Sequence, residues 1–199
     1  MKMLLIGGKR IFPETIHYAE VFMACYDPQQ LTLTWKPLPL IGDDAEPRSY
    51  HSAVCHRDGV VYIFGGIVQN VYSNELCTLC PAQRLWRNIS CAEVPGYAPP
   101  VPRSGHVAFI DETGEKMIVA GSYAEDSEDL TVAVLHFASM RWSVARVDPR
   151  GQTPSRRAAI SGALLPQMIG GARLPMMVVF GGFELTARRC FNDLFVLPL

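Results

Sequence analysis

Short apolar runs, each ended by glycine, recur along the chain. They read MLLIGG at 3–8, VVYIFGG at 60–66, KMIVAGS at 116–122 and PMMVVFGG at 175–182. Runs of this length, rich in branched and aromatic side chains and bounded by glycine, are typical of buried strands and are too short for helices. The pattern therefore predicts four equivalent strands, one in each quarter of the sequence.

A second marker precedes three of these strands. It reads PRSYHSAV at 47–54, PRSGHVAF at 102–109 and, more weakly, PSRRAAIS at 154–161. In the last of these, Ala159 aligns with the histidines of the other two. Segments that recur in one fixed order indicate a repeat architecture.

Tryptophan is the third marker, and the polar stretches between markers divide each unit into strands. Trp35, Trp86 and Trp142 each follow one glycine strand by a similar interval. The turn sequence RDG at 57–59 splits HSAVCHRDGVVYIFGG into a hairpin, and DETGE at 111–115 does the same in the next unit. Each unit is thus predicted to be a four-stranded antiparallel sheet, and radial repetition of such sheets gives an all-β propeller.

These markers together resemble the kelch repeat, whose period is about 50 residues. The resemblance covers the whole chain and implies a kelch-type β-propeller with units at about 1–40, 47–95, 102–147 and 154–199. Ala120 departs from the first glycine of the pair in the third unit. The tryptophans are expected to be buried against the neighbouring blade. The repeat markers are Gly7, Gly8, Trp35, His51, Gly65, Gly66, Trp86, His106, Gly121, Trp142, Gly181 and Gly182.

The outer units are expected to be incomplete. If the strands of a unit are labelled a to d, the chain reads bcd-abcd-abcd-abc, because no room remains for a first strand a or a last strand d. About four blades in this order predict an open or incomplete ring. Open blade edges and faces invite association, so the chain is expected to be part of a larger ring or to be completed by another chain.

Composition narrows the function classes. The net charge is −1, from 18 basic and 19 acidic residues, which gives no electrostatic case for nucleic acid or a membrane surface. No apolar run is long enough to span a bilayer. Cys77 and Cys80 form a C-x-x-C, but strand positions three apart point to opposite faces, so no metal site is expected. The expectation is a cytoplasmic protein with reduced cysteines and no cofactor.

The kelch resemblance implies a protein-interaction module without catalysis. In a propeller the d–a and b–c connections surround one mouth of the central channel, and arginines opening strand a can read acidic peptides in this family. Guanidinium groups bind carboxylates in bidentate geometry. The alternative is that each arginine anchors its own blade. The expected partner-binding residues are Arg48, Ser49, Arg103, Ser104 and Arg156.

Two other functions stay open at this point. A galactose-oxidase-like propeller enzyme fragment would need two histidines, two tyrosines and a cysteine to converge, and the available histidines are His17, His51, His56, His106 and His136. The second is a degenerate fragment of a larger kelch protein. The acidic stretch AEDSED at 124–129 lacks the spacing of a calcium loop and is expected to be solvated, as is the pair Arg188–Arg189.

Overall fold

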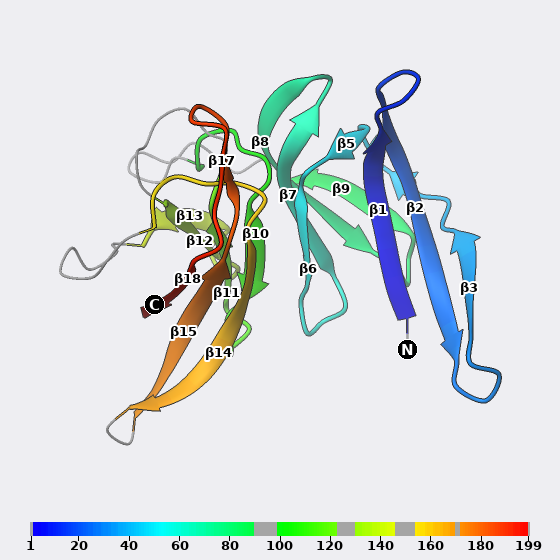
Figure 1. The fold of residues 1–199 in the computed structure, drawn as a ribbon. Coiled ribbons are helices and arrows are strands. Elements are labelled where there is room, and N and C mark those ends of the chain that lie inside the picture. The colour runs from blue at the N-terminus through cyan, green and yellow to red at the C-terminus, as the bar shows by residue number, and fades with distance from the viewer. Residues whose placement is uncertain (1, 90–98, 123–129, 146–153, 170–171, 199) are drawn as a thin grey trace.

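The computed structural model is an all-β arc of four sheets standing side by side (Figure 1). It describes residues 2–89, 99–122, 130–145, 154–169 and 172–198. Each sheet is one blade of an incomplete kelch-type β-propeller. No strand of the first sheet pairs with the last among these residues, so the described arc is open.

The first blade has three strands in the order β1-β2-β3 and the second is the largest, with order β4-β9-β8-β7-β5 and β6 also paired to β7. All of these pairings are antiparallel except β4 with β9. The strands are β1 (Lys2–Arg10), β2 (Ile16–Asp27), β3 (Thr32–Pro37), β4 (Ile41–Gly42), β5 (Arg48–Ser49), β6 (Ser52–Cys55), β7 (Val61–Val68), β8 (Val71–Cys80) and β9 (Leu85–Ile89).

The third blade is an antiparallel β10-β11-β12-β13 sheet and the fourth is β14-β15-β18, with the two-stranded β16-β17 ribbon inserted before β18. The sheets therefore follow the strand order bcd, abcd, abcd, abc. The strands are β10 (Val107–Ile110), β11 (Lys116–Ala120), β12 (Val132–His136), β13 (Arg141–Val144), β14 (Ser161–Ile169), β15 (Ala172–Phe180), β16 (Phe183–Glu184), β17 (Arg189–Cys190) and β18 (Leu194–Pro198).

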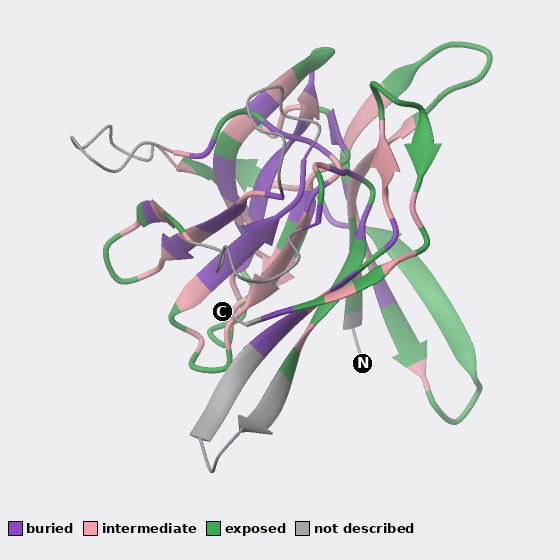
Figure 2. Cartoon of the chain, turned by 60° about the vertical axis from the view of Figure 1, so that its left-hand side comes forward, coloured by how far each residue is buried: buried purple, intermediate pink, exposed green. Residues whose placement is uncertain are grey.

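Three apolar cores lie between consecutive blades. Alternate side chains of each glycine strand point to opposite faces, so one strand supplies both neighbouring cores. In β7, Ile63 faces the first blade and Phe64 faces the third, and both are fully buried. Figure 2 shows buried residues concentrated where the sheets face one another. The fold is thus a row of sheets in which each blade packs on its neighbours.

Two tryptophans are buried against the preceding blade and one is not. Trp86 and Trp142 are 1% and 2% exposed and belong to the cores on the first and second blades. Trp35 is 43% exposed, because the described chain has no blade before the first sheet. The expectation of burial is therefore wrong for Trp35, and it holds for the other two.

Candidate functional site

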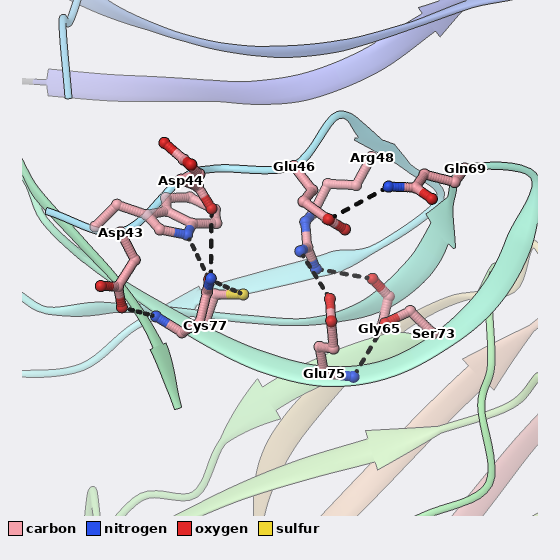
Figure 3. A network of polar contacts seen from close by, with 11 residues as sticks. Asp43, Asp44, Glu46, Arg48, Gly65, Gln69, Ser73, Glu75 and Cys77 are labelled. Carbon is pink, nitrogen blue, oxygen red and sulfur yellow. Dashed lines mark hydrogen bonds and ion pairs between the residues drawn. The ribbon is translucent and has the colours of Figure 1, made fainter. Parts of the chain in front are cut away.

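A buried arginine clamps the strands of the second blade together (Figure 3). Arg48 lies in β5 and is 2% exposed. Its guanidinium donates to the Gly65 carbonyl within β7, at 3.4 Å, and to the Glu75 carboxylate on β8, at 3.2 Å. The side chain therefore ties three strands of one blade to each other.

The same position recurs in the third and fourth blades. Arg103 is 3% exposed and donates to Thr131 Oγ1 and to the Val101 carbonyl, both at 3.2 Å. Arg157 is also buried, and it donates to the Gly181 carbonyl and forms an ion pair with Asp193. These contacts are those of a blade anchor, which was the alternative reading of this position.

The third arginine of this set is Arg157, one residue after the expected Arg156. The residue two places after each buried arginine has a left-handed backbone, with φ of 55° at Tyr50, 65° at Gly105 and 53° at Ala159. Ile160, and not Ala159, therefore stands where the other blades have histidine. A Cβ on Gly121 would meet Ile160 and the Arg157 carbonyl, as one on Gly65 would meet His106 and the Arg103 carbonyl. Gly121 is therefore the first residue of its pair and Ser122 the second, so the first position is not Ala120.

The two serines at the next position are buried as well. Ser49 is 2% exposed, with its hydroxyl 3.1 Å from His17 Nδ1, and Ser104 is fully buried. Arg156 differs from the other four predicted partner-binding residues because it is half-buried. A partner at the surface therefore has access to Arg156 and almost none to Arg48, Ser49, Arg103 and Ser104.

The glycine and histidine markers form the joint between blades. A Cβ on Gly65 would lie 2.8 Å from the Arg103 carbonyl and 2.9 Å from the His106 ring, and its φ is +64°. His106 Nε2 lies 3.2 Å from the Phe64 carbonyl. Gly7 has the same relation to Arg48 and His51 one blade earlier. A side chain at the first glycine would therefore push neighbouring blades apart.

Burial keeps these histidines neutral. Desolvation, with repulsion from Arg48, lowers the pKa of His51 to about 4. Desolvation, with repulsion from Arg103 and His51, lowers the pKa of His106 to about 3. Since the carbonyl of Phe64 must accept from the ring, His106 carries its proton on Nε2.

A hollow of about 110 Å³ opens on the face that carries the b–c connections. Residues from three blades meet there: Tyr72 from β8, Ser122 after β11, and Arg156 with the Phe183–Thr186 segment of the fourth blade. Arg156 donates to Thr186 Oγ1 at 3.4 Å. The sequence located the b–c loops at 67–74 and 183–190 but did not single out Tyr72, Phe183 or Leu185. The available signal was an aromatic ring in each of these two loops, at Tyr72 and Phe183. The wall is made of Tyr72, Ser122, Arg156, Arg157, Phe183, Glu184, Leu185 and Thr186.

The histidines are dispersed over separate structural contacts. His56 Nε2 lies 2.8 Å from the Gly114 carbonyl in the neighbouring hairpin, and His136 Nε2 lies 2.9 Å from Ser143 Oγ. Within the described ranges, no three histidine, cysteine, aspartate or glutamate side chains are grouped to hold a metal ion. The acidic stretch 124–129 lies outside those ranges, and they contain no helix long and apolar enough to cross a membrane.

Comparison with known proteins gives a family match and several relatives. The sequence model of the KLHDC2/KLHL20/DRC7 Kelch-repeats domain matches residues 1–199. The chain is 31% identical over 153 residues to Adagio-like protein 1 of Oryza sativa subsp. japonica, covering 75% of the chain and 22% of that protein. It is 30% identical over 172 residues to Acyl-CoA-binding domain-containing protein 6 of the same plant, covering 83% and 24%.

A third relative is the flagellar outer-arm dynein alpha chain of Chlamydomonas reinhardtii, which is 25% identical over 168 residues, covering 83% of the chain and 4% of that protein. The chain thus spans a quarter or less of the length of these relatives. The repeated joints, the blade order and the match over residues 1–199 agree, and the chain belongs to the kelch-repeat family.

Proposed function

We propose that this chain is a non-catalytic kelch interaction module that binds an acidic peptide at the face where the b–c connections converge. Kelch-repeat domains generally act as protein-interaction modules. The observation that carries the finer proposal is the hollow shared by three blades, with the half-buried Arg156 in its wall. Its other residues offer an aromatic ring and apolar side chains beside hydrogen-bonding hydroxyls.

The chemistry of the hollow fits a peptide carboxylate next to an apolar residue. The Arg156 guanidinium is more accessible to a partner than that of Arg157 in the same wall, because Arg156 is half-buried and Arg157 is fully buried. Phe183 and Leu185 supply apolar contact, and Tyr72 supplies a ring with a polar end. Glu184 in the same wall would repel a second acidic group, which favours one well-placed carboxylate over a long acidic run.

We further propose that the module acts in the cytoplasm, without a cofactor. Within the described ranges five cysteines are free, which supports a reducing environment: Cys25, Cys55, Cys77, Cys80 and Cys190. Burial raises the pKa of the Cys77 thiol to about 11, which keeps that thiol protonated and unreactive. The engagement of His51, His56 and His106 in contacts between blades supports a structural use of these side chains.

The test is binding of fluorescein-labelled peptides that carry Glu or Asp beside a Leu or Phe, each paired with its Gln or Asn counterpart. We expect the acidic member of a pair to bind and Arg156→Glu to weaken its binding at least ~10-fold, because the substitution replaces attraction by repulsion. Arg87→Glu is the matched control, since Arg87 is exposed on β9.

Equal binding by the Arg156→Glu protein and by the Arg87→Glu protein would overturn the site. Equal binding of the acidic and amide peptides would overturn the carboxylate preference. Circular dichroism of both variants checks that neither substitution disturbs the sheets.

A further inference from the structure

The second blade satisfies two buried donors with acceptors of its own. The Arg48 guanidinium is paired with Glu75, and the Trp86 indole N–H donates to Asn88 Oδ1 at 2.9 Å. The two donors adjoin, since the Arg48 Cζ lies 5.9 Å from the centre of the Trp86 ring. Figure 3 shows this network around Arg48 and Glu75. In the second blade, Arg48 thus has a carboxylate as acceptor and the Trp86 indole has an amide oxygen.

Register identifies the equivalent positions in the third blade. Phe64, before the first glycine of β7, pairs with Leu76, and Ala120, before Gly121, pairs with Val132. The residue that precedes each partner is Glu75 in the second blade and Thr131 in the third. In the fourth blade the same rule gives Asp193, which is paired with Arg157. Only the third blade lacks an acid at this position among the described blades that have the arginine.

The second acceptor is also replaced. Asn88 stands two residues after Trp86, and Val144 stands two residues after Trp142. As a result the buried Trp142 Nε1 has no hydrogen-bond partner among the described residues. A buried N–H that has given up water without gaining a partner destabilises the fold. The third blade thus keeps both donors, but it has a hydroxyl in place of the carboxylate and an apolar side chain in place of the amide.

Arg103 is a buried cation without a carboxylate partner in the described part of the chain. Its contacts are a hydroxyl and a carbonyl. Desolvation lowers the pKa of Arg103 to about 10. The guanidinium stays charged near neutral pH, and binding of an anion beside this buried positive charge would be favourable.

Arg103 and Trp142 both line one cavity of about 330 Å³ on the third blade. Thr131 and Ser143 add hydroxyls, and the rest of the wall is mainly apolar, including Val101, Val132 and Val144. A mainly apolar pocket with a few converging polar groups is the usual form of a small-molecule site. This cavity does not share a residue with the hollow around Arg156.

We propose that this cavity binds a small carboxylate with an apolar body. One carboxylate oxygen accepts from the Arg103 guanidinium and the other from the Trp142 indole N–H, so the ligand takes the places that Glu75 and Asn88 occupy in the second blade. The apolar body lies against Val101, Val132 and Val144. A free carboxylic acid and an acidic amino-acid side chain share this chemistry.

The test follows the indole N–H resonances of ¹⁵N-labelled protein. The chain has three tryptophans, and Trp→Phe variants assign their resonances. We expect hexanoate to shift the Trp142 resonance in a saturable manner and to leave those of Trp86, which is bonded to Asn88, and Trp35 in place. Hexanamide, which lacks the charge, is expected to shift none of them. N-acetyl-glutamate-N-methylamide shows whether a glutamate side chain is also accepted.

A repaired blade provides the decisive comparison. Thr131→Glu with Val144→Asn restores the two acceptors of the second blade. We expect this protein to gain about 2–4 °C in Tm for each kcal/mol recovered, and to lose the hexanoate response at least 10-fold. Thr34→Glu, on the exposed strand β3, is the control for the added charge.

Two results overturn the proposal. One is an unshifted Trp142 resonance at saturating hexanoate and at saturating N-acetyl-glutamate-N-methylamide. The other is an undiminished hexanoate response in the repaired protein. An equal response to hexanamide would overturn the carboxylate assignment.

Discussion

The joint between blades depends on a few residues whose roles are set by backbone geometry. The first glycine needs both a left-handed backbone and the absence of a side chain, and the histidine of the next blade packs on it. The buried arginine holds the strands within a blade. Because His51 and His106 are neutral in the folded state, the joint is sensitive to acid.

We expect acid to destabilise the fold through these histidines. The pKa values of His51 and His106 lie near 4 and 3 in the folded protein and near 6.5 in the unfolded chain, so the unfolded state takes up protons first as the pH falls. The free energy of unfolding should fall between about pH 6.5 and pH 3, and at pH 5 it should already be lower by about 2 kcal/mol for each histidine. Urea unfolding at pH 7.5 and pH 5 measures the loss.

His106→Gln is the informative variant, because an amide can still donate to the Phe64 carbonyl and does not titrate. It should be less stable than the wild type at pH 7.5 and should lose less stability between pH 7.5 and pH 5. The control is His136→Gln, at a side chain that is only partly buried. Equal pH dependence in the His106→Gln and wild-type proteins would contradict the assignment.

Sequence repeats identified most residues of this joint, but the alignment of the fourth unit was wrong by one residue. Gly7, Gly65 and the two histidines were identified because the glycine strand and the PRS-x-H segment recur along the chain. The fourth unit contains two adjacent arginines, and its left-handed residue is Ala159, which sequence does not mark as glycine does. Burial of Arg48 and Arg103 could not be predicted either, because the sequence pattern around an arginine at a strand start is the same whether the side chain faces solvent or the blade interior.

The blades themselves are the next scale, and their strand order follows directly from the sequence markers. Antiparallel order, the three-stranded outer sheets and the hairpins are those expected. The two-residue strands β4, β5, β16 and β17 were not anticipated, since two residues carry no alternation of apolar and polar positions. The cavity of the third blade was not predicted either. It depends on two replacements relative to the second blade: Thr131 stands where that blade has Glu75, and Val144 stands where it has Asn88.

Tryptophan substitution should separate the blades by their packing. We expect Trp86→Ala to cost about 3–5 kcal/mol, since the ring fills a core between two blades and leaves a cavity. Trp35→Ala should cost less than ~1.5 kcal/mol, because 43% of that side chain is exposed. Chemical denaturation of the two variants measures the difference, and equal losses would show that the absence of a described blade against Trp35 does not lower its contribution to stability.

At the scale of the whole molecule, the arc ends in two apolar faces. Met3 and Leu5 on the first blade are 43% and 52% exposed, whereas Val61 and Ile63, at the same positions of the second blade, are 5% and 0% exposed. On the far side of the fourth blade, Leu165, Phe180, Leu194 and Val196 are 48–59% exposed. The two faces are the two halves of the kind of interface that joins the inner blades.

We therefore expect the chain to associate with itself as its concentration rises, fourth blade to first blade. Light scattering coupled to size exclusion should give an apparent mass above 22.0 kDa that increases with concentration. Leu5→Lys with Phe180→Lys should restore the monomer mass, because each lysine places a charge in the contact. Val71→Lys with Leu185→Lys, at exposed residues away from both faces, is the control. A monomer mass for the wild type at every concentration would contradict this expectation.

One contact between blades involves no side chain at all. The Gly105 N–H donates to the Tyr50 carbonyl at 2.9 Å, and the Ala159 N–H donates to the Gly105 carbonyl at 2.7 Å. These three residues are the left-handed positions of successive blades, and they are tyrosine, glycine and alanine. Since the bonds belong to the main chain, a repeat can drift in sequence at this point and keep its connection. Duplicated units can therefore diverge into specialised blades, as the third has done around Arg103, while the propeller still assembles.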